Sequence, residues 1–110
     1  MKLLFFILMF VSSFSFASST DFANIRQLNY DGNADYTYFL ADGGWSVKAT
    51  DSSILCTPTY VQIKNDVPGR DKILSIGLAA YMAKKQVQFH GTCTEGASYF
   101  HATYIIVGNN

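Results

Sequence analysis

The sequence predicts an α+β domain that is mainly β, with a small antiparallel sheet or barrel and one amphipathic helix at about residues 70–84. Apolar and polar residues alternate in several short segments, which is the pattern of half-buried strands. Only residues 70–84 change to a helical period. Strands that do not alternate regularly with helices favour an antiparallel α+β fold, which can curl into a small barrel.

The first 17 residues have the features of a secretory signal peptide. Lys2 gives a positive start, residues 3–11 are an unbroken apolar run, and Ser15 and Ala17 suit the cleavage site. The run is too short for a helix to cross a bilayer of about 30 Å. We expect residues 18–110 to form one exported domain, periplasmic or extracellular, with no membrane span. A buried N-terminal helix or a membrane anchor is the alternative.

The charge balance argues against nucleic acid as a partner. Without residues 1–17, and so without Lys2, the chain keeps seven basic and eight acidic residues, a net charge of −1. Nucleic-acid binding depends on neutralising phosphates, so a near-neutral domain has no electrostatic drive toward it. The pair Lys84 and Lys85 is better explained as the C-terminal end of a helix.

Two cysteines, Cys56 and Cys93, remain after the predicted cleavage. In an oxidising compartment an even pair predicts one disulfide. In the chain-entropy treatment, closing the loop between Cys56 and Cys93 stabilises the folded domain by about 4 kcal/mol. A redox or metal role is the alternative, but the pair lacks C-x-x-C spacing and the chain has only two histidines. We expect no metal and no cofactor.

Short strands separated by turns precede the helix. We expect residues 18–24 to fray, and strands at 25–30, 36–40, 45–49 and 59–64. Asp42, Gly43 and Gly44 are a strong hairpin signal between the second and third of these. After the helix, we expect strands at 86–90 and 99–107, with residues 91–96 as the turn between them. The last strand is apolar on both faces, as a central strand would be.

The helix presents an apolar stripe. Leu74, Leu78 and Tyr81 recur at helical spacing, and Ile73, Gly77 and Ala80 widen the stripe. Two interpretations of Gly77 stay open. The glycine either lets the helix lie close to the sheet, or is tolerated there at a cost of about 1 kcal/mol.

Residues 68–107 resemble the C-terminal half of the B subunits of AB5 toxins of the cholera and heat-labile enterotoxin type. The matching words are LAAYMAKKQVQF, then Cys93, then the strand around HATYIIV. The resemblance implies an OB-like barrel with a helix across it, a disulfide at Cys93, and assembly into a homo-oligomeric ring. In that family the first cysteine lies near the mature N-terminus, whereas Cys56 lies mid-chain. The aromatic residue that follows the second cysteine is absent here, so the resemblance assigns no ligand residue.

Aromatic residues are the most informative excess. Tyrosine and tryptophan join an apolar face to a hydrogen-bonding tip, and so suit sugar faces and protein interfaces. Tyr36 and Tyr38 share a strand face, and Trp45 follows across the glycine turn. If that hairpin forms, these three residues make a ligand-binding patch. The alternative is that Trp45 and some of the tyrosines fill the core.

No catalytic motif is present in the sequence, so we do not expect an enzyme. His90 and His101 lie on strands flanking Cys93, and a small hydrolase would need them to meet. The sequence favours a secreted, non-catalytic module that binds glycan or protein. The alternative is a monomeric periplasmic or secreted inhibitor or envelope accessory protein.

Overall fold

A computed structural model describes residues 18–49, 51–94 and 98–108. The predicted signal peptide at residues 1–17 lies outside the described residues. The described part is a mainly β domain with one helix, which confirms the predicted class. In chain order its elements are β1 (Ser18–Thr20), β2 (Ala23–Asp31), β3 (Tyr36–Ala41), β4 (Val47–Lys48), β5 (Ile54–Cys56), β6 (Tyr60–Ile63), α1 (Arg70–Ala83), β7 (Gln86–Cys93) and β8 (Tyr99–Val107).

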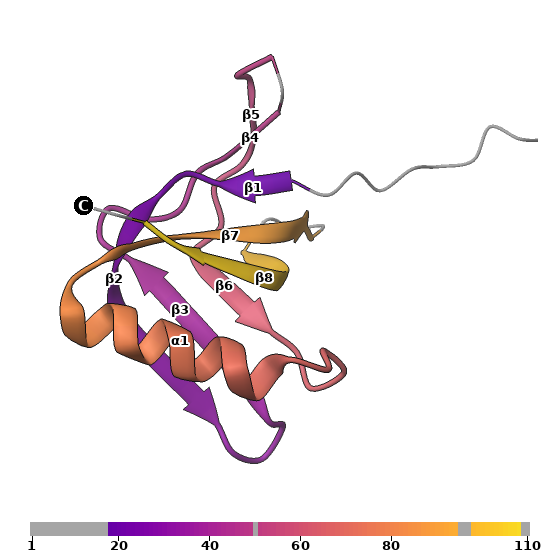
Figure 1. The fold of residues 1–110 in the computed structure, drawn as a ribbon. Coiled ribbons are helices and arrows are strands. Elements are labelled where there is room, and N and C mark those ends of the chain that lie inside the picture. The colour runs from indigo at the N-terminus through magenta and orange to yellow at the C-terminus, as the bar shows by residue number, and fades with distance from the viewer. Residues whose placement is uncertain (1–17, 50, 95–97, 109–110) are drawn as a thin grey trace, which may run out of the picture.

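Five strands close into a barrel (Figure 1). The neighbours run β2-β3-β6-β8-β7, and β7 pairs again with β2 where Ala23 lies opposite Val87. β1 pairs with a further part of β7, and β4 and β5 extend the sheet from β1. A five-stranded ring with one helix between β6 and β7 is the arrangement of a small OB-like barrel.

The sheet is mixed, whereas the sequence predicts an antiparallel sheet. β6 and β8 run parallel, with Tyr60 opposite Tyr99 and Gln62 opposite His101. The chain between them contains α1 and β7, and a connection of that length is what parallel pairing requires. The sequence shows where these strands lie, but not that they become neighbours.

The barrel interior is filled by residues that alternate along the strands. Phe39 contacts Phe89 with ring centroids 4.9 Å apart, and Phe100 is fully buried beside them. Burying side chains of this size contributes about 1.5–3 kcal/mol each. The other fully buried aliphatic residues are Val47, Val61, Ile63 and Val87. β8 is less apolar on its outer side than a strand buried on both faces would be, since Thr103 and Tyr104 are exposed.

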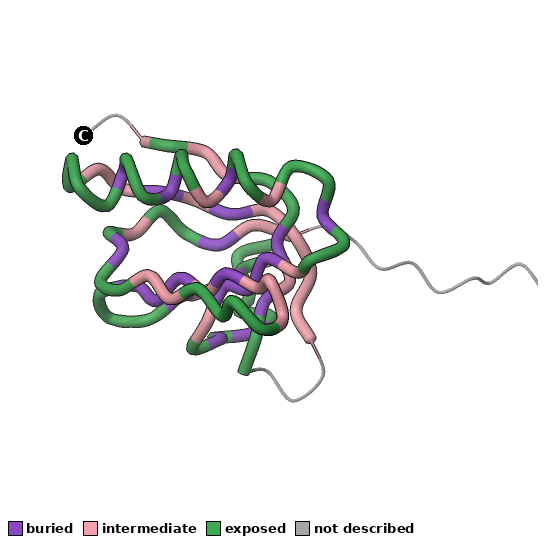
Figure 2. The backbone as a smooth tube through the Cα atoms, turned by 90° about the horizontal axis from the view of Figure 1, so that it is seen from below, coloured by how far each residue is buried: buried purple, intermediate pink, exposed green. Residues whose placement is uncertain are grey.

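The helix forms where predicted but packs through only part of the predicted stripe. It ends at Ala83, and Lys84 adopts a left-handed conformation at its C-cap. Buried positions recur along the helix (Figure 2), and they are Ile73, Gly77 and Ala80. Leu78 and Tyr81, expected in the core, are exposed because the small residues bring the helix axis close to the barrel. In the described part of the chain, no helix is long and apolar enough to span a membrane.

Several strand boundaries differ from the predicted ones. Residues 18–20, expected to fray, pair with β4 and β7. β7 continues to Cys93, so residues 91–93 are strand instead of turn. β5 was not predicted. The turn at Asp42 and Gly43 forms, but β3 and β4 do not pair with each other, so the predicted hairpin is wrong.

Candidate functional site

Trp45 does not belong to an exposed patch. It is 2 % exposed, and its indole Nε1 donates a 2.9 Å hydrogen bond to the carbonyl oxygen of Phe39. Its ring meets Phe89 edge to face at 5.3 Å. Of the two interpretations that the sequence leaves open, the structure supports a core position for Trp45, which therefore does not share an exposed patch with Tyr36 and Tyr38. Without the hairpin, the chain after the glycine turn carries the indole into the core.

Tyr36 and Tyr38 lie on the outer side of β3, where two other tyrosines join them. Tyr60 begins β6 and Tyr99 begins β8, and these two rings stack at 5.5 Å. Tyr38 meets Tyr60 edge to face at 5.7 Å and lies 6.0 Å from Tyr99. Tyr36 is 6.4 Å from Tyr38. The parallel pairing of β6 with β8 thus places four aromatic rings side by side.

A shallow depression lies among these rings. Asn29, Tyr38, Tyr60 and Tyr99 line it, and its volume is about 180 Å³. We call it the tyrosine hollow. Tyr99 is 37 % exposed, while the other tyrosines of the hollow are half-buried. Half-buried rings are held in place by their neighbours and still offer a surface to a ligand.

Beside the hollow, polar side chains lie in one row across neighbouring strands of the barrel. Strand register places Asn29 opposite Tyr38, Tyr38 opposite Gln62, and Gln62 opposite His101. The amide Nε2 of Gln62 donates a 3.3 Å hydrogen bond to the hydroxyl of Tyr38. Amide and phenol groups both donate and accept hydrogen bonds. Asn29 and the tyrosines that line the hollow can therefore pair with ligand hydroxyls, while the buried Gln62 holds the hydroxyl of Tyr38 in place.

Among the residues that the structure describes, no charged side chain lines the tyrosine hollow. Burial lowers the pKa of His101 below its ordinary value of 6.5; the nearby positive charge of Lys64 acts in the same direction and Asp66 opposes both. This lowered pKa favours the neutral form of the imidazole at the end of the row. The site suits a neutral, hydroxyl-rich ligand better than an ionised one.

The two histidines do not lie opposite each other in the sheet. His90 lies opposite Tyr104 in the β7–β8 register and contacts its ring edge to face at 4.8 Å, whereas His101 lies opposite Thr92. Among the described residues, no group of three or more histidine, cysteine, aspartate or glutamate side chains is placed to hold a metal ion.

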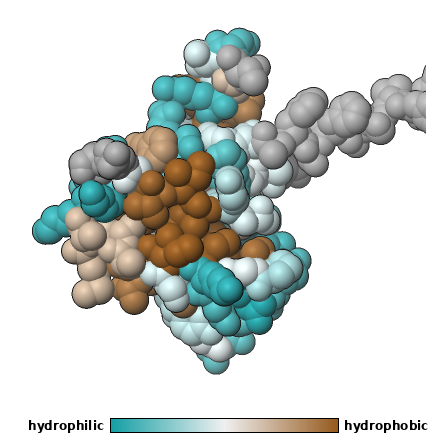
Figure 3. Space-filling model, viewed as in Figure 1, coloured by the Kyte–Doolittle hydropathy of each residue, from teal (hydrophilic) through white to brown (hydrophobic). Residues whose placement is uncertain are grey.

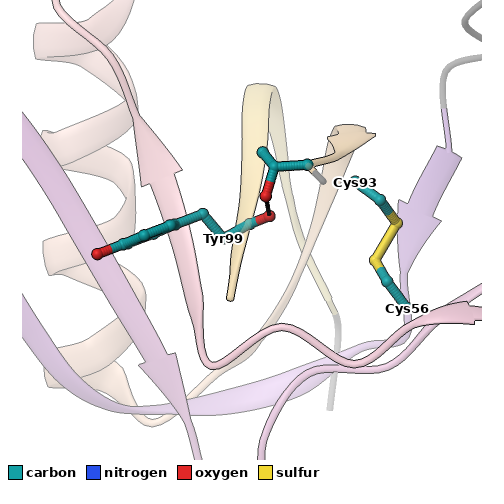
Figure 4. The surroundings of a disulfide bond; sticks show 4 residues. Cys56, Cys93 and Tyr99 are labelled. Carbon is teal, nitrogen blue, oxygen red and sulfur yellow. Dashed lines mark hydrogen bonds between the residues drawn. A yellow bond between two sulfur atoms is a disulfide. The ribbon is translucent and has the colours of Figure 1, made fainter. Parts of the chain in front are cut away.

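The predicted disulfide is present. Cys56 and Cys93 are bonded, with their Cα atoms 6.3 Å apart, within the usual range for a disulfide. The bond joins the end of β5 to the end of β7. It lies near the chain segments that lead into the stacked tyrosines (Figure 4).

Two wider grooves have a different chemistry. One of about 420 Å³ lies at the C-terminal end of α1, where Asp42, Lys84 and Lys85 are among the residues lining it. Another of about 530 Å³ follows the glycine turn between Arg26 and Thr59. Neither groups several aromatic side chains with neutral amides, so the tyrosine hollow is the stronger candidate despite its smaller size.

Comparison with known proteins adds no assignment. No family model, no curated protein and no solved structure matches this chain.

Proposed function

We propose that this protein is an exported, non-catalytic module that binds a saccharide at the tyrosine hollow. The observation that carries the proposal is the convergence of Tyr38, Tyr60 and Tyr99 beside the amides of Asn29 and Gln62. A sugar ring has an apolar C–H face and a rim of hydroxyls, which match aromatic faces and polar groups respectively.

The volume of the hollow limits the size of the ligand that it can hold. Pockets that enclose a drug-sized ligand measure about 300–1,000 Å³, and this hollow measures about 180 Å³. It therefore suits one sugar ring, such as the terminal residue of a glycan. The described residues that line the hollow are all uncharged, which favours a neutral sugar over an acidic one.

Four further features support export and a binding role. The N-terminal pattern is that of a signal peptide, and the Cys56–Cys93 bond suits an oxidising compartment. The resemblance of residues 68–107 to B subunits of AB5 toxins agrees with a binding subunit, in which several copies would each present a hollow. Tyrosine-lined contact without an activated nucleophile is typical of recognition and not of catalysis.

A glycan array tests the proposal with the mature, oxidised protein. We expect binding to one class of neutral terminal sugars, and a loss of about 5- to 30-fold in Tyr60→Ala and in Tyr99→Ala, as for a contact worth 1–2 kcal/mol. Tyr104→Ala is the matched control, because Tyr104 is 54 % exposed on β8 but contacts His90. A blank array, or equal loss in the control, contradicts the proposal.

A second candidate is a module that binds a protein, as an inhibitor or envelope accessory protein would. Figure 3 shows apolar side chains gathered on the side of the molecule that carries α1. The helix exposes Ile76, Leu78 and Met82, the last by 73 %. Exposed apolar patches often mark protein interfaces. Light scattering separates the cases: a monomer that pulls down one protein partner favours the inhibitor, and a multiple of the monomer mass favours a ring.

A further inference from the structure

The stacked tyrosines lie where their strands are weakest. Tyr60 is the first residue of β6 and Tyr99 is the first residue of β8. The parallel pairing between these strands spans only three residue pairs, beginning with this one. Strand ends fray, so the stacking of the two rings needs support from beyond the ladder.

That support comes from two sets of hydrogen bonds. The backbone amides of Thr59 and Tyr60 both donate to the carbonyl oxygen of Ser98, each at 3.1 Å. The amide of Thr94 donates to the carbonyl oxygen of Tyr99 at 3.2 Å, and its hydroxyl Oγ1 donates to the same oxygen at 2.7 Å. The first set holds the start of β6 against the start of β8, and the second fixes Tyr99 to the end of β7.

Both donor segments follow directly from the disulfide. Thr94 is next to Cys93, which lies opposite Phe100 in the β7–β8 register. Thr59 and Tyr60 follow Cys56 through Pro58, a fully buried residue with a fixed φ. Figure 4 shows the sulfur–sulfur bond joining the two segments, with the ring of Tyr99 directed away from it.

We infer that the Cys56–Cys93 disulfide and Thr94 are positioning elements of the tyrosine hollow. In the oxidised chain they hold Tyr60 and Tyr99 in register, and the rings stack. A dithiol reductant supplies two electrons and two protons, so that the disulfide becomes two thiols while the dithiol becomes its own disulfide. The segment that leads into β6 then separates from the end of β7, and the hollow loses one wall. The consequence for ligand affinity rests on the proposed function, whereas the consequence for the rings does not.

Nuclear magnetic resonance of ring-labelled tyrosine tests the geometry without any ligand. Stacked rings shift each other's proton resonances. We expect a dithiol to move the ring resonances of Tyr60 and Tyr99 toward unstacked values, while those of Tyr30 and the buried indole of Trp45 stay unchanged. If the cysteines are reduced and the Tyr60 and Tyr99 resonances keep their positions, the inference is overturned.

If reduction unfolds the whole domain, a variant that keeps the disulfide tests how the tyrosine rings are positioned. Thr94→Val removes the hydroxyl donor and leaves the disulfide intact. Thr103→Val is the matched control, because Thr103 is an exposed threonine on the same strand as Tyr99. We expect Thr94→Val to shift the Tyr60 and Tyr99 resonances and Thr103→Val to leave them in place. Equal spectra for both variants contradict the role of Thr94.

A saccharide that the array identifies gives the functional arm of the test. Thr94→Val should weaken its binding about 2- to 10-fold, as expected for one lost hydrogen bond, and Thr103→Val should not. If Thr94→Val shifts the tyrosine resonances but leaves the affinity unchanged, the rings are positioned as inferred but do not hold the ligand. That outcome contradicts the proposed function and leaves the positioning role intact. Unchanged resonances of Tyr60 and Tyr99 contradict the positioning role of Thr94, whether or not the saccharide binds.

Discussion

Gly77 rests directly on the ring of Phe39. A Cβ atom at Gly77 would lie 2.5 Å from Cζ of Phe39, far inside van der Waals contact. Phe39 is fully buried between the barrel interior and α1. Of the two interpretations that the sequence leaves open for this glycine, close approach of the helix to the sheet is the one that the structure supports.

Replacing Gly77 with alanine should therefore destabilise the domain. Alanine gains about 1 kcal/mol in helix propensity, but overpacking a rigid core costs typically 1–3 kcal/mol. Because the ring of Phe39 is fully buried, we expect a net loss of up to about 2 kcal/mol in the free energy of unfolding. Urea denaturation followed by Trp45 fluorescence measures it.

A double-mutant cycle is the control for that substitution. Phe39→Leu alone leaves a void and destabilises, but it makes room for the new methyl group. We expect Gly77→Ala to cost less in the Phe39→Leu background than in the wild type, which is the signature of direct contact. If the losses in stability from Gly77→Ala and Phe39→Leu simply add, the two residues are not in direct contact and the cost of the new methyl group arises elsewhere.

An ion-pair cluster ties the β2–β3 turn to the start of α1. Arg70 Nε donates to Asp35 Oδ2 at 2.8 Å, and the hydroxyl of Tyr30 donates to Asp35 Oδ1 at 2.8 Å. The Tyr30 hydrogen bond and then the Arg70 hydrogen bond lower the pKa of Asp35 below its ordinary value of 3.8. The cluster therefore stabilises the fold above pH 3.8, and this stability is lost as the pH falls through the lowered pKa.

Asp35→Asn tests this cluster. Asparagine tolerates the positive φ of 61° at this position, so the substitution mainly removes the charge. We expect the wild type to be the more stable protein at neutral pH. The difference should shrink with acidification below pH 3.8 and with added salt. A difference that is independent of both pH and salt would contradict an electrostatic origin.

His101 should titrate below its ordinary value of 6.5, because burial disfavours its charged form. The unfolded chain then binds a proton more readily than the folded chain as the pH drops. Stability contributed by the neutral imidazole is present above pH 6.5 and declines as the pH falls below it. Proton resonances of the imidazole measure the pKa directly. Lys64→Gln should raise this pKa, and no change would exclude Lys64 as a cause.

Removing the disulfide should cost stability on the scale of the loop it closes. Cys56→Ala combined with Cys93→Ala should lower the free energy of unfolding by about 4 kcal/mol, through the greater entropy of the unfolded chain. Thermal denaturation in non-reducing buffer checks this. The wild type in dithiol should show a similar loss, and the double variant should not respond to the dithiol at all.

Local patterning predicts much of this fold. The alternation at residues 59–64 and the helical period at 70–84 both match elements of the structure, because each pattern depends only on one buried face. The cysteine pair also follows from composition and compartment. The packing face of α1 was harder to predict, because Gly77 and Ala80 pack by being small, whereas Leu78 has the more apolar side chain and is exposed.

The candidate site depends on pairings that no local pattern contains. Tyr36 and Tyr38 could be predicted to share a face, because strand residues alternate. Their neighbours Tyr60 and Tyr99 come together through the parallel β6–β8 pair, which forms across the whole α1–β7 segment. The predicted hairpin before Trp45 does not form, because Gly43 and Gly44, with φ of 78° and 86°, lead the chain toward β1 and not back along β3.

The most direct test of the account is to locate the bound sugar on the oxidised protein. Methyl glycosides of neutral hexoses, added in turn to ring-labelled and amide-labelled protein, should move the resonances of Tyr38, Tyr60, Tyr99 and Asn29. Those of Tyr81 and Met82 at the end of α1 should stay fixed. Shifts confined to the helix, or no shift with any glycoside at millimolar concentration, would contradict a saccharide site in the tyrosine hollow.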